Sequence, residues 1–150
     1  MSSFLTAPNC AAFTSRVNAV KPDSQRQFGS LDSRAMLCHL RRALEISLGE
    51  VEIPDSSNVL TRTIVRYMAF HVVPWPKGRI KAPSAFTPAP ENAFEAEREL
   101  LHQAIERFIK TVEREPNKVV CHPVFGPMTM TYWCRVHGKH FDHHLKQFGV

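Results

Sequence analysis

The last part of the chain concentrates histidines at a spacing that suits metal chemistry. The segment HGKHFDHHLKQFG, residues 137–149, contains His137, His140, His143 and His144. In a helix, His140 and His144 lie one turn apart on the same face. Two imidazoles at this spacing can bind one divalent metal ion, because their ring nitrogens reach a common point. The segment therefore predicts two ligands of a metal site.

A third ligand has to come from another helix. His39 lies in the segment LDSRAMLCHLRRALEISLG, in line with its apolar face. Packing this face against that of the last helix would bring His39 to His140 and His144. A lone histidine on an apolar face is more often a hydrogen-bonded core residue. Three imidazoles buried together without a metal, however, would leave ring nitrogens without partners. His71 and His102 remain alternatives to His39.

Other side chains near the predicted site have supporting roles. Trp133 and Gln147 share the buried stripe of the two histidines, and Gln147 is expected to hydrogen-bond a ligand histidine or a metal-bound water. His137 stands at the margin of this face as a further pocket residue. Asp142 lies about 200° round the helix from the first ligand of the pair, facing away. No catalytic base is identified. Cys121 and His122, in the CHP stretch before the last helix, are expected at the pocket mouth, with Cys121 a minor candidate for a nucleophile.

Three neutral imidazoles would leave coordination positions open for water or substrate, as in catalytic sites, whereas structural sites are closed by four protein ligands. Such an ion lowers the pKa of a bound water or thiol and makes a nucleophile available. Nickel, zinc, iron and manganese all suit imidazole ligands. We predict a divalent-metal-dependent enzyme with a small-molecule substrate, either a transferase that uses a low-molecular-weight thiol or a hydrolase. The alternatives are a non-enzymatic metal-binding or stress-related module and a metal-free helical interaction domain.

The periodicity of apolar residues predicts the elements that position these side chains. No segment shows the alternation of a strand, so an all-α single domain over residues 1–150 is expected: a helix bundle with one long connection. Four prolines between Trp75 and Pro90 exclude a long helix there. Asp32 or Ser30 is expected to cap one helix, and Thr129 or Thr131 another. The expected helices cover about residues 9–20, 31–48, 58–73, 91–115 and 129–148.

Composition sets the broad class of protein. The 150 residues, with 43% hydrophobic and 22% charged residues, suit one globular domain. No apolar run reaches the roughly 20 residues of a membrane span, and no signal-like start is seen, so a cytoplasmic location is expected. Four cysteines without a C-x-x-C pair indicate free thiols. Basic residues are scattered despite a net charge of +5, which argues against a nucleic-acid partner. Phe86 and Phe125, expected to be exposed, favour a homodimer.

The stretch HPVFGPMTMTYWCRVHGKHFDHHLKQFG resembles the C-terminal signature of the DinB-like (DinB/YfiT) superfamily. Within it, the likeness is to a branch of uncharacterised bacterial proteins that end in HPxFGxL…W…HxxHHLxQFG. Upstream, VNAVKPDSQRQFGSLDSRAMLCHL and the proline-rich PWPKGRIKAPSAF resemble segments of the same family. The similarity covers roughly residues 16–149, and the C-terminal motif is its most specific part.

This resemblance implies a four-helix bundle of the DinB/YfiT type, commonly a homodimer, with a divalent metal held by three histidines. His39 matches the first ligand, His140 and His144 match the H-x-x-x-H pair, and Gln147 matches the family's H-x-x-Q. Phe28 departs from the family's usual tryptophan. Superfamily relatives include thiol-dependent S-transferases, hydrolases and isomerases, whereas this branch lacks an assigned reaction.

Overall fold

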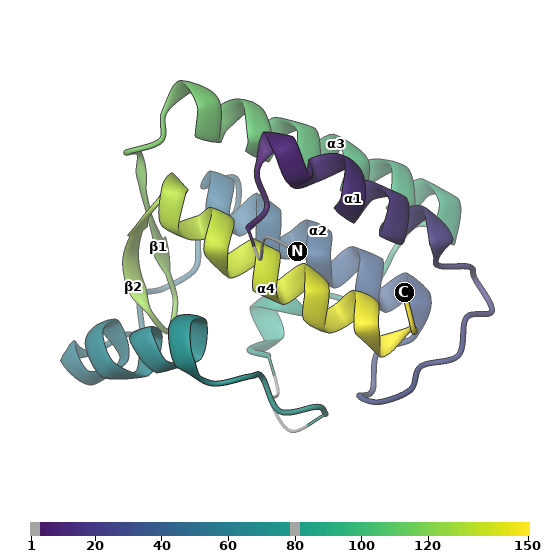
Figure 1. Cartoon of the computed structure of the whole chain (residues 1–150), viewed down its shortest axis with the longest axis horizontal. Coiled ribbons are helices and arrows are strands. Elements are labelled where there is room, and N and C mark those ends of the chain that lie inside the picture. The colour runs from purple at the N-terminus through teal and green to yellow at the C-terminus, as the bar shows by residue number, and fades with distance from the viewer. Residues whose placement is uncertain (1–3, 79–81) are drawn as a thin grey trace.

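The computed structural model describes residues 4–78 and 82–150. The chain is mostly helical, as predicted, and carries one two-stranded antiparallel sheet (Figure 1). Helix α1 packs against α3 and α4, and α2 packs against the same two helices. None of the described helices has the length and apolar character to cross a membrane. The long helices are α1 (Ala7–Ala19), α2 (Ser33–Leu48), α3 (Phe94–Arg114) and α4 (Met130–Gln147).

The two helices that carry the histidines have clear end signals. Asp32 caps α2, because its side chain accepts a hydrogen bond from the backbone N–H of Ala35 at 2.7 Å. Gly49 ends the helix in the left-handed conformation, with φ of 79°. Thr129 caps α4 in the same way, accepting from the backbone N–H of Tyr132. Both caps are among those that the sequence predicts.

The core lies between the four long helices. Helix α3 buries the apolar face predicted for it, and Glu97 is buried on the same helix, which its sequence pattern does not predict. Its carboxylate accepts hydrogen bonds from Arg41 at 3.0 Å and from Asn92 at 2.9 Å. Paired in this way, a carboxylate tolerates burial. The largest fully buried side chains include Trp133, Phe108, Phe141, Leu37, Leu44, Leu101 and Ile105.

The expectation of a fold without strands is wrong. Strands β1 (Val119–His122) and β2 (Gly126–Thr129) form a hairpin that leads directly into α4 (Figure 1). Each strand has only four residues, too few for an alternating pattern to stand out, and β2 contains Pro127. A two-stranded ribbon tolerates this proline because it has an unpaired edge. The hairpin therefore forms in a stretch that reads as a loop.

Residues 59–72 form the predicted helix before Pro74, but with π-helical turns η1 (Thr61–Val65) and η2 (Met68–Val72). The helix lies beside the hairpin and outside the group of four long helices (Figure 1). Within residues 59–73, Phe70 is the one buried side chain. Apart from Val119, the exposed large apolar residues of the described part of the chain gather here.

The proline-rich connection contains the short 3₁₀ helix η3 (Ser84–Phe86), while its residues 79–81 lie outside the described part. Phe86 is buried and Phe125 is half-buried, so the prediction that they are exposed is wrong. Both rings pack around His122, at centroid distances of 5.4 and 4.8 Å. They line a cavity inside the molecule and do not offer a surface for a partner.

Candidate metal site

His39 from α2 meets His140 and His144 from α4. One ring nitrogen of each lies within 4.8 Å of the others, so the three residues could hold a metal ion. The Nε2 atoms of His39 and His140 are 2.8 Å apart. The ring centroids are 4.7 to 4.8 Å from one another. Two facing helices thus bring together residues that are about 100 positions apart in sequence.

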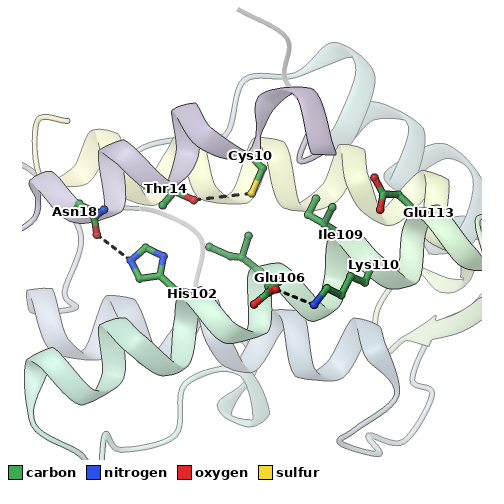
Figure 2. A pocket seen from close by; sticks show the side chains of 9 residues that line it. Cys10, Thr14, Asn18, His102, Glu106, Ile109, Lys110 and Glu113 are labelled. Atoms are coloured by element: carbon green, nitrogen blue, oxygen red, sulfur yellow. Dashed lines mark hydrogen bonds and ion pairs between the residues drawn. The ribbon is translucent and has the colours of Figure 1, made fainter.

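The alternative third ligands lie elsewhere. His71 is exposed beside Tyr132, with its Nε2 3.4 Å from the phenol oxygen. His102 lies in a groove of about 560 Å³ between α1 and α3 and contacts Asn18 at 2.8 Å (Figure 2). Other polar side chains in this groove also pair with each other, as the dashed lines of Figure 2 show for Glu106 and Lys110. Neither histidine joins the cluster.

Hydrogen bonds set the tautomers of two members of the cluster. Nδ1 of His39 lies 2.6 Å from the carbonyl oxygen of Phe86. A carbonyl oxygen only accepts, so this Nδ1 carries the proton and Nε2 presents a lone pair to the cluster. Nδ1 of His144 lies 3.1 Å from Oε1 of Gln147, whose Nε2 donates to the carbonyl oxygen of Phe28 at 2.6 Å. His144 therefore also has an unprotonated Nε2.

Burial keeps these imidazoles neutral. It lowers the pKa of His39, and it lowers the pKa of His144 to about 3. Burial also holds the pKa of His140 well below its ordinary value, with a further contribution from the neighbouring histidines. Neutral imidazole is the form that binds metals. Two nitrogens bound to one tetrahedral ion at about 2.0–2.1 Å are about 3.3 Å apart, so the two Nε2 atoms, at 2.8 Å, would have to separate slightly around an ion.

The three histidines line a cavity of about 1020 Å³. Its wall is formed by α2, the helix of residues 59–72, the proline-rich connection, the hairpin and α4. Trp75 from the connection lies over the cluster, 5.9 Å from the ring of His140 and 5.7 Å from that of His143. Within residues 4–78 and 82–150, no acidic or basic side chain other than histidine lines the cavity. The polar groups of the cavity are therefore mainly imidazoles.

Comparison with known families places the chain. A family model for proteins of unknown function, DUF1569, matches residues 3–149. The chain belongs to the DUF1569 family. The match includes α2, the hairpin and α4, and so all three clustered histidines. No significant similarity to a curated protein or to a solved structure was found. Membership of DUF1569 does not by itself show a DinB-like relationship, which stays a prediction.

The DUF1569 structure also places the other residues singled out from the sequence. Trp133 is buried on the cavity wall, and its indole N–H donates to the carbonyl oxygen of Val120 at 3.2 Å, tying α4 to the hairpin. His137 is fully buried and bonds through Nε2 to Ser47. Asp142 is not part of the cluster: its carboxylate pairs with Arg16 of α1 and with Lys146 one turn further along α4.

Two groups of this DUF1569 site come from a connecting segment and were not predicted from the sequence. Trp75 and the carbonyl group of Phe86 belong to the proline-rich connection, where no helical or strand periodicity assigns a direction to a side chain. A backbone carbonyl leaves no mark in a sequence at all. For Trp75, the one available signal is a large aromatic residue in a stretch too rich in proline to form a core element.

Gln147 connects the cluster to the backbone of Phe28, which predicts an effect on metal affinity in this DUF1569 protein. Replacing Gln147 with leucine removes the acceptor that orients His144, so we expect metal affinity to fall about 10- to 100-fold. Competition titration against a chelating dye measures the change. Gln103→Leu, at an exposed position on α3, serves as the control. Equal affinities of the two variants would contradict a role of Gln147 in orienting the ligand.

Proposed function

We propose that this protein binds one divalent metal ion through His39, His140 and His144 and is a metal-dependent enzyme, with transfer to a small thiol as the favoured reaction. The observation that carries the proposal is the cluster itself. Three neutral imidazoles converge on the wall of a large cavity, and two of them are held in the metal-binding tautomer by Phe86 and Gln147. Nickel, zinc, iron and manganese are all candidates for the ion.

Two features favour catalysis over a structural role. Three protein ligands leave coordination positions free, and the cavity is of the size that takes small molecules. A divalent ion in such a site lowers the pKa of a bound thiol or water, so that thiolate or hydroxide forms near neutral pH. The neutral lining does not compensate the charge of a cation, which favours an anionic partner such as a thiolate.

The proposed reaction is a substitution at carbon. The thiolate sulfur forms a bond to an electrophilic carbon of the substrate, the leaving group departs with the electron pair of the broken bond, and the thiol proton passes to solvent. The mostly apolar wall of the cavity would hold the body of the substrate and exclude water, which favours sulfur over water as nucleophile. The resemblance to DinB-like proteins, some of which are thiol-dependent transferases, and to their four-helix bundle supports the same choice.

Turnover assays test the proposed activity. Protein loaded in turn with each candidate metal would be incubated with glutathione or cysteine and an aryl halide, and with an ester to detect hydrolysis. We expect turnover that depends on metal, is lost in His144→Ala and persists in His102→Ala, a change of a histidine in the groove between α1 and α3. Metal binding without thiol transfer or hydrolysis would contradict the proposed enzyme and indicate a non-enzymatic metal-binding module.

We also propose that the protein forms a homodimer through the exposed face of residues 59–73. Exposed apolar patches larger than a few hundred Å² are rare on monomeric proteins and mark interaction sites. A standard homodimer interface buries roughly 800 Å² per chain, of which about 65% is apolar. Two copies related by a two-fold axis would cover each other's patch. The patch consists of the exposed apolar residues that do not line the cavity, namely Val59, Leu60, Ile64, Tyr67 and Val72, with Val119 of the neighbouring hairpin.

The cations of this segment are held against their own chain, which leaves the outer face apolar. Arg62 pairs with Asp55 at 2.8 Å, and Arg66 donates to the carbonyl oxygen of Pro127 at 3.0 Å. We expect sedimentation analysis to show a dimer for the parent and a monomer for Ile64→Asp. Gln103→Asp on α3 should stay dimeric. A parent that is monomeric at all concentrations would exclude the dimer.

A further inference from the structure

The turn of the hairpin sets the tautomer of His122. The backbone N–H groups of Val124 and Phe125 both donate to its Nδ1, at 3.1 and 3.2 Å. A nitrogen that accepts hydrogen bonds carries no proton, so the proton of neutral His122 is on Nε2. Burial lowers the pKa of His122 to about 4, and the ring is therefore neutral at pH 7. His122 presents one N–H donor.

Aromatic neighbours hold the plane of this imidazole. Phe86 stacks on it with an interplanar angle of 28°, and Trp133 lies 5.3 Å away at 33°. His122 is 8% exposed and lines the same cavity as the three clustered histidines. Within the part of the chain that the structure describes, Nε2 meets no acceptor, although its Nδ1 meets two donors. A partner in the cavity would complete the hydrogen bonding of this ring.

Phe86 connects this donor to the metal site. Its carbonyl oxygen accepts from Nδ1 of His39, and its ring stacks on His122. The positions of the His39 and His122 rings in the cavity therefore both depend on Phe86. Between and around them the lining is largely aliphatic and aromatic. A ligand that fits has an apolar body, a group for the metal and an oxygen that accepts a hydrogen bond.

We propose that His122 is a substrate-binding residue whose Nε2–H donates a hydrogen bond to a carbonyl or carboxylate oxygen of an apolar substrate. The inference deepens the proposed function, on which it rests for the group that meets the metal. It adds the class of substrate: an apolar carbonyl compound or carboxylic acid. The role is one of binding and orientation, since burial lowers the pKa of His122, so that the ring does not take up a second proton near pH 7 and acts as a hydrogen-bond donor through its Nε2–H.

The test uses hexanamide and hexanoate, two probes of nearly equal shape that differ in charge, with metal-free and zinc-loaded protein. In the parent we expect both to bind, hexanoate more tightly once zinc is present. His122→Phe keeps an aromatic ring in the stack and removes the donor. We expect it to weaken binding of hexanamide about tenfold while zinc affinity stays unchanged. Unaltered hexanamide affinity, or no binding of either probe to the parent, would overturn the proposal.

A second measurement covers the case in which the variant folds poorly. In the parent labelled with ¹⁵N-histidine, NMR should show Nδ1 of His122 unprotonated and Nε2 protonated at pH 7, and hexanamide should shift the Nε2–H signal. The opposite tautomer, or a signal that hexanamide leaves in place, would refute the role. Binding of hexanamide to the metal-free protein tests His122 alone, and the zinc titration tests the metal site. The two experiments therefore distinguish failure of the proposed function from failure of this inference.

Discussion

The double variant His140→Ala/His144→Ala should lose stoichiometric metal binding. Each ligand of a protein-bound zinc ion contributes roughly 3 kcal/mol, so removing two should weaken affinity about 10⁴-fold. Both residues lie with His39 in the cluster, and the single imidazole that remains is a weak site. Competition against a fluorescent chelator gives the affinities of parent and variant.

The matched control is His71→Ala/His102→Ala, which removes the same number of imidazoles outside the cluster. This variant should bind metal as the parent does, and circular dichroism should show that both double variants remain helical. Parent-like affinity in the cluster variant, or an equal loss in the control, would contradict the assignment of the ligands.

The variant Arg41→Ala should destabilise the protein strongly. Glu97 is fully buried, and Arg41 contacts it through two guanidinium nitrogens, at 3.0 and 3.3 Å. Removing the cation leaves a buried carboxylate with the amide of Asn92 as its remaining partner. We expect the free energy of unfolding to fall by about 3–5 kcal/mol in urea denaturation. Arg107→Ala, which breaks an exposed pair with Glu50, should cost at most about 1 kcal/mol.

This destabilisation should depend on pH in a defined direction. Burial alone would raise the pKa of Glu97, but hydrogen bonds from Arg41 and Asn92 lower it below its ordinary value. A depressed pKa in the folded state stabilises the protein above the unfolded-state pKa of about 4.3, and the stabilisation is lost as pH falls through the folded-state pKa. The difference between parent and Arg41→Ala should therefore shrink on acidification. A difference that grows in acid would show that the pair does not stabilise the fold.

The long helices were predictable because their apolar residues recur at helical spacing, and α2 and α4 also begin at recognisable caps. Asp32 and Thr129 accept hydrogen bonds at the predicted helix starts. The hairpin was not predictable, since each strand has only four residues and β2 begins with Gly126 and Pro127. The exposure of residues 59–73 could not be predicted from the sequence either. An apolar segment has the same sequence pattern whether it packs against its own core or against another chain.

In the candidate site, too, the residues on helices were predictable and those from connecting segments were not. The i,i+4 spacing places His140 and His144 together, and the apolar face of α2 directs His39 toward them, so local periodicity indicated the cluster but left His71 and His102 as alternatives to His39. Phe86 and Trp75 reach the site from a segment without periodicity. The tautomer of His122 depends on backbone N–H groups in a turn. Such contributions come from tertiary packing, and the sequence does not encode them as a local pattern.

The metal content of the untagged protein decides whether the three histidines form a metal site. It is measured by elemental analysis after purification without chelators and after incubation with nickel, zinc, iron or manganese. The proposed site should hold about one equivalent of a divalent ion per chain, bound through His39, His140 and His144. A protein that stays folded and takes up none of the four ions would contradict it, and the buried histidines would then be core residues of a helical protein without a metal.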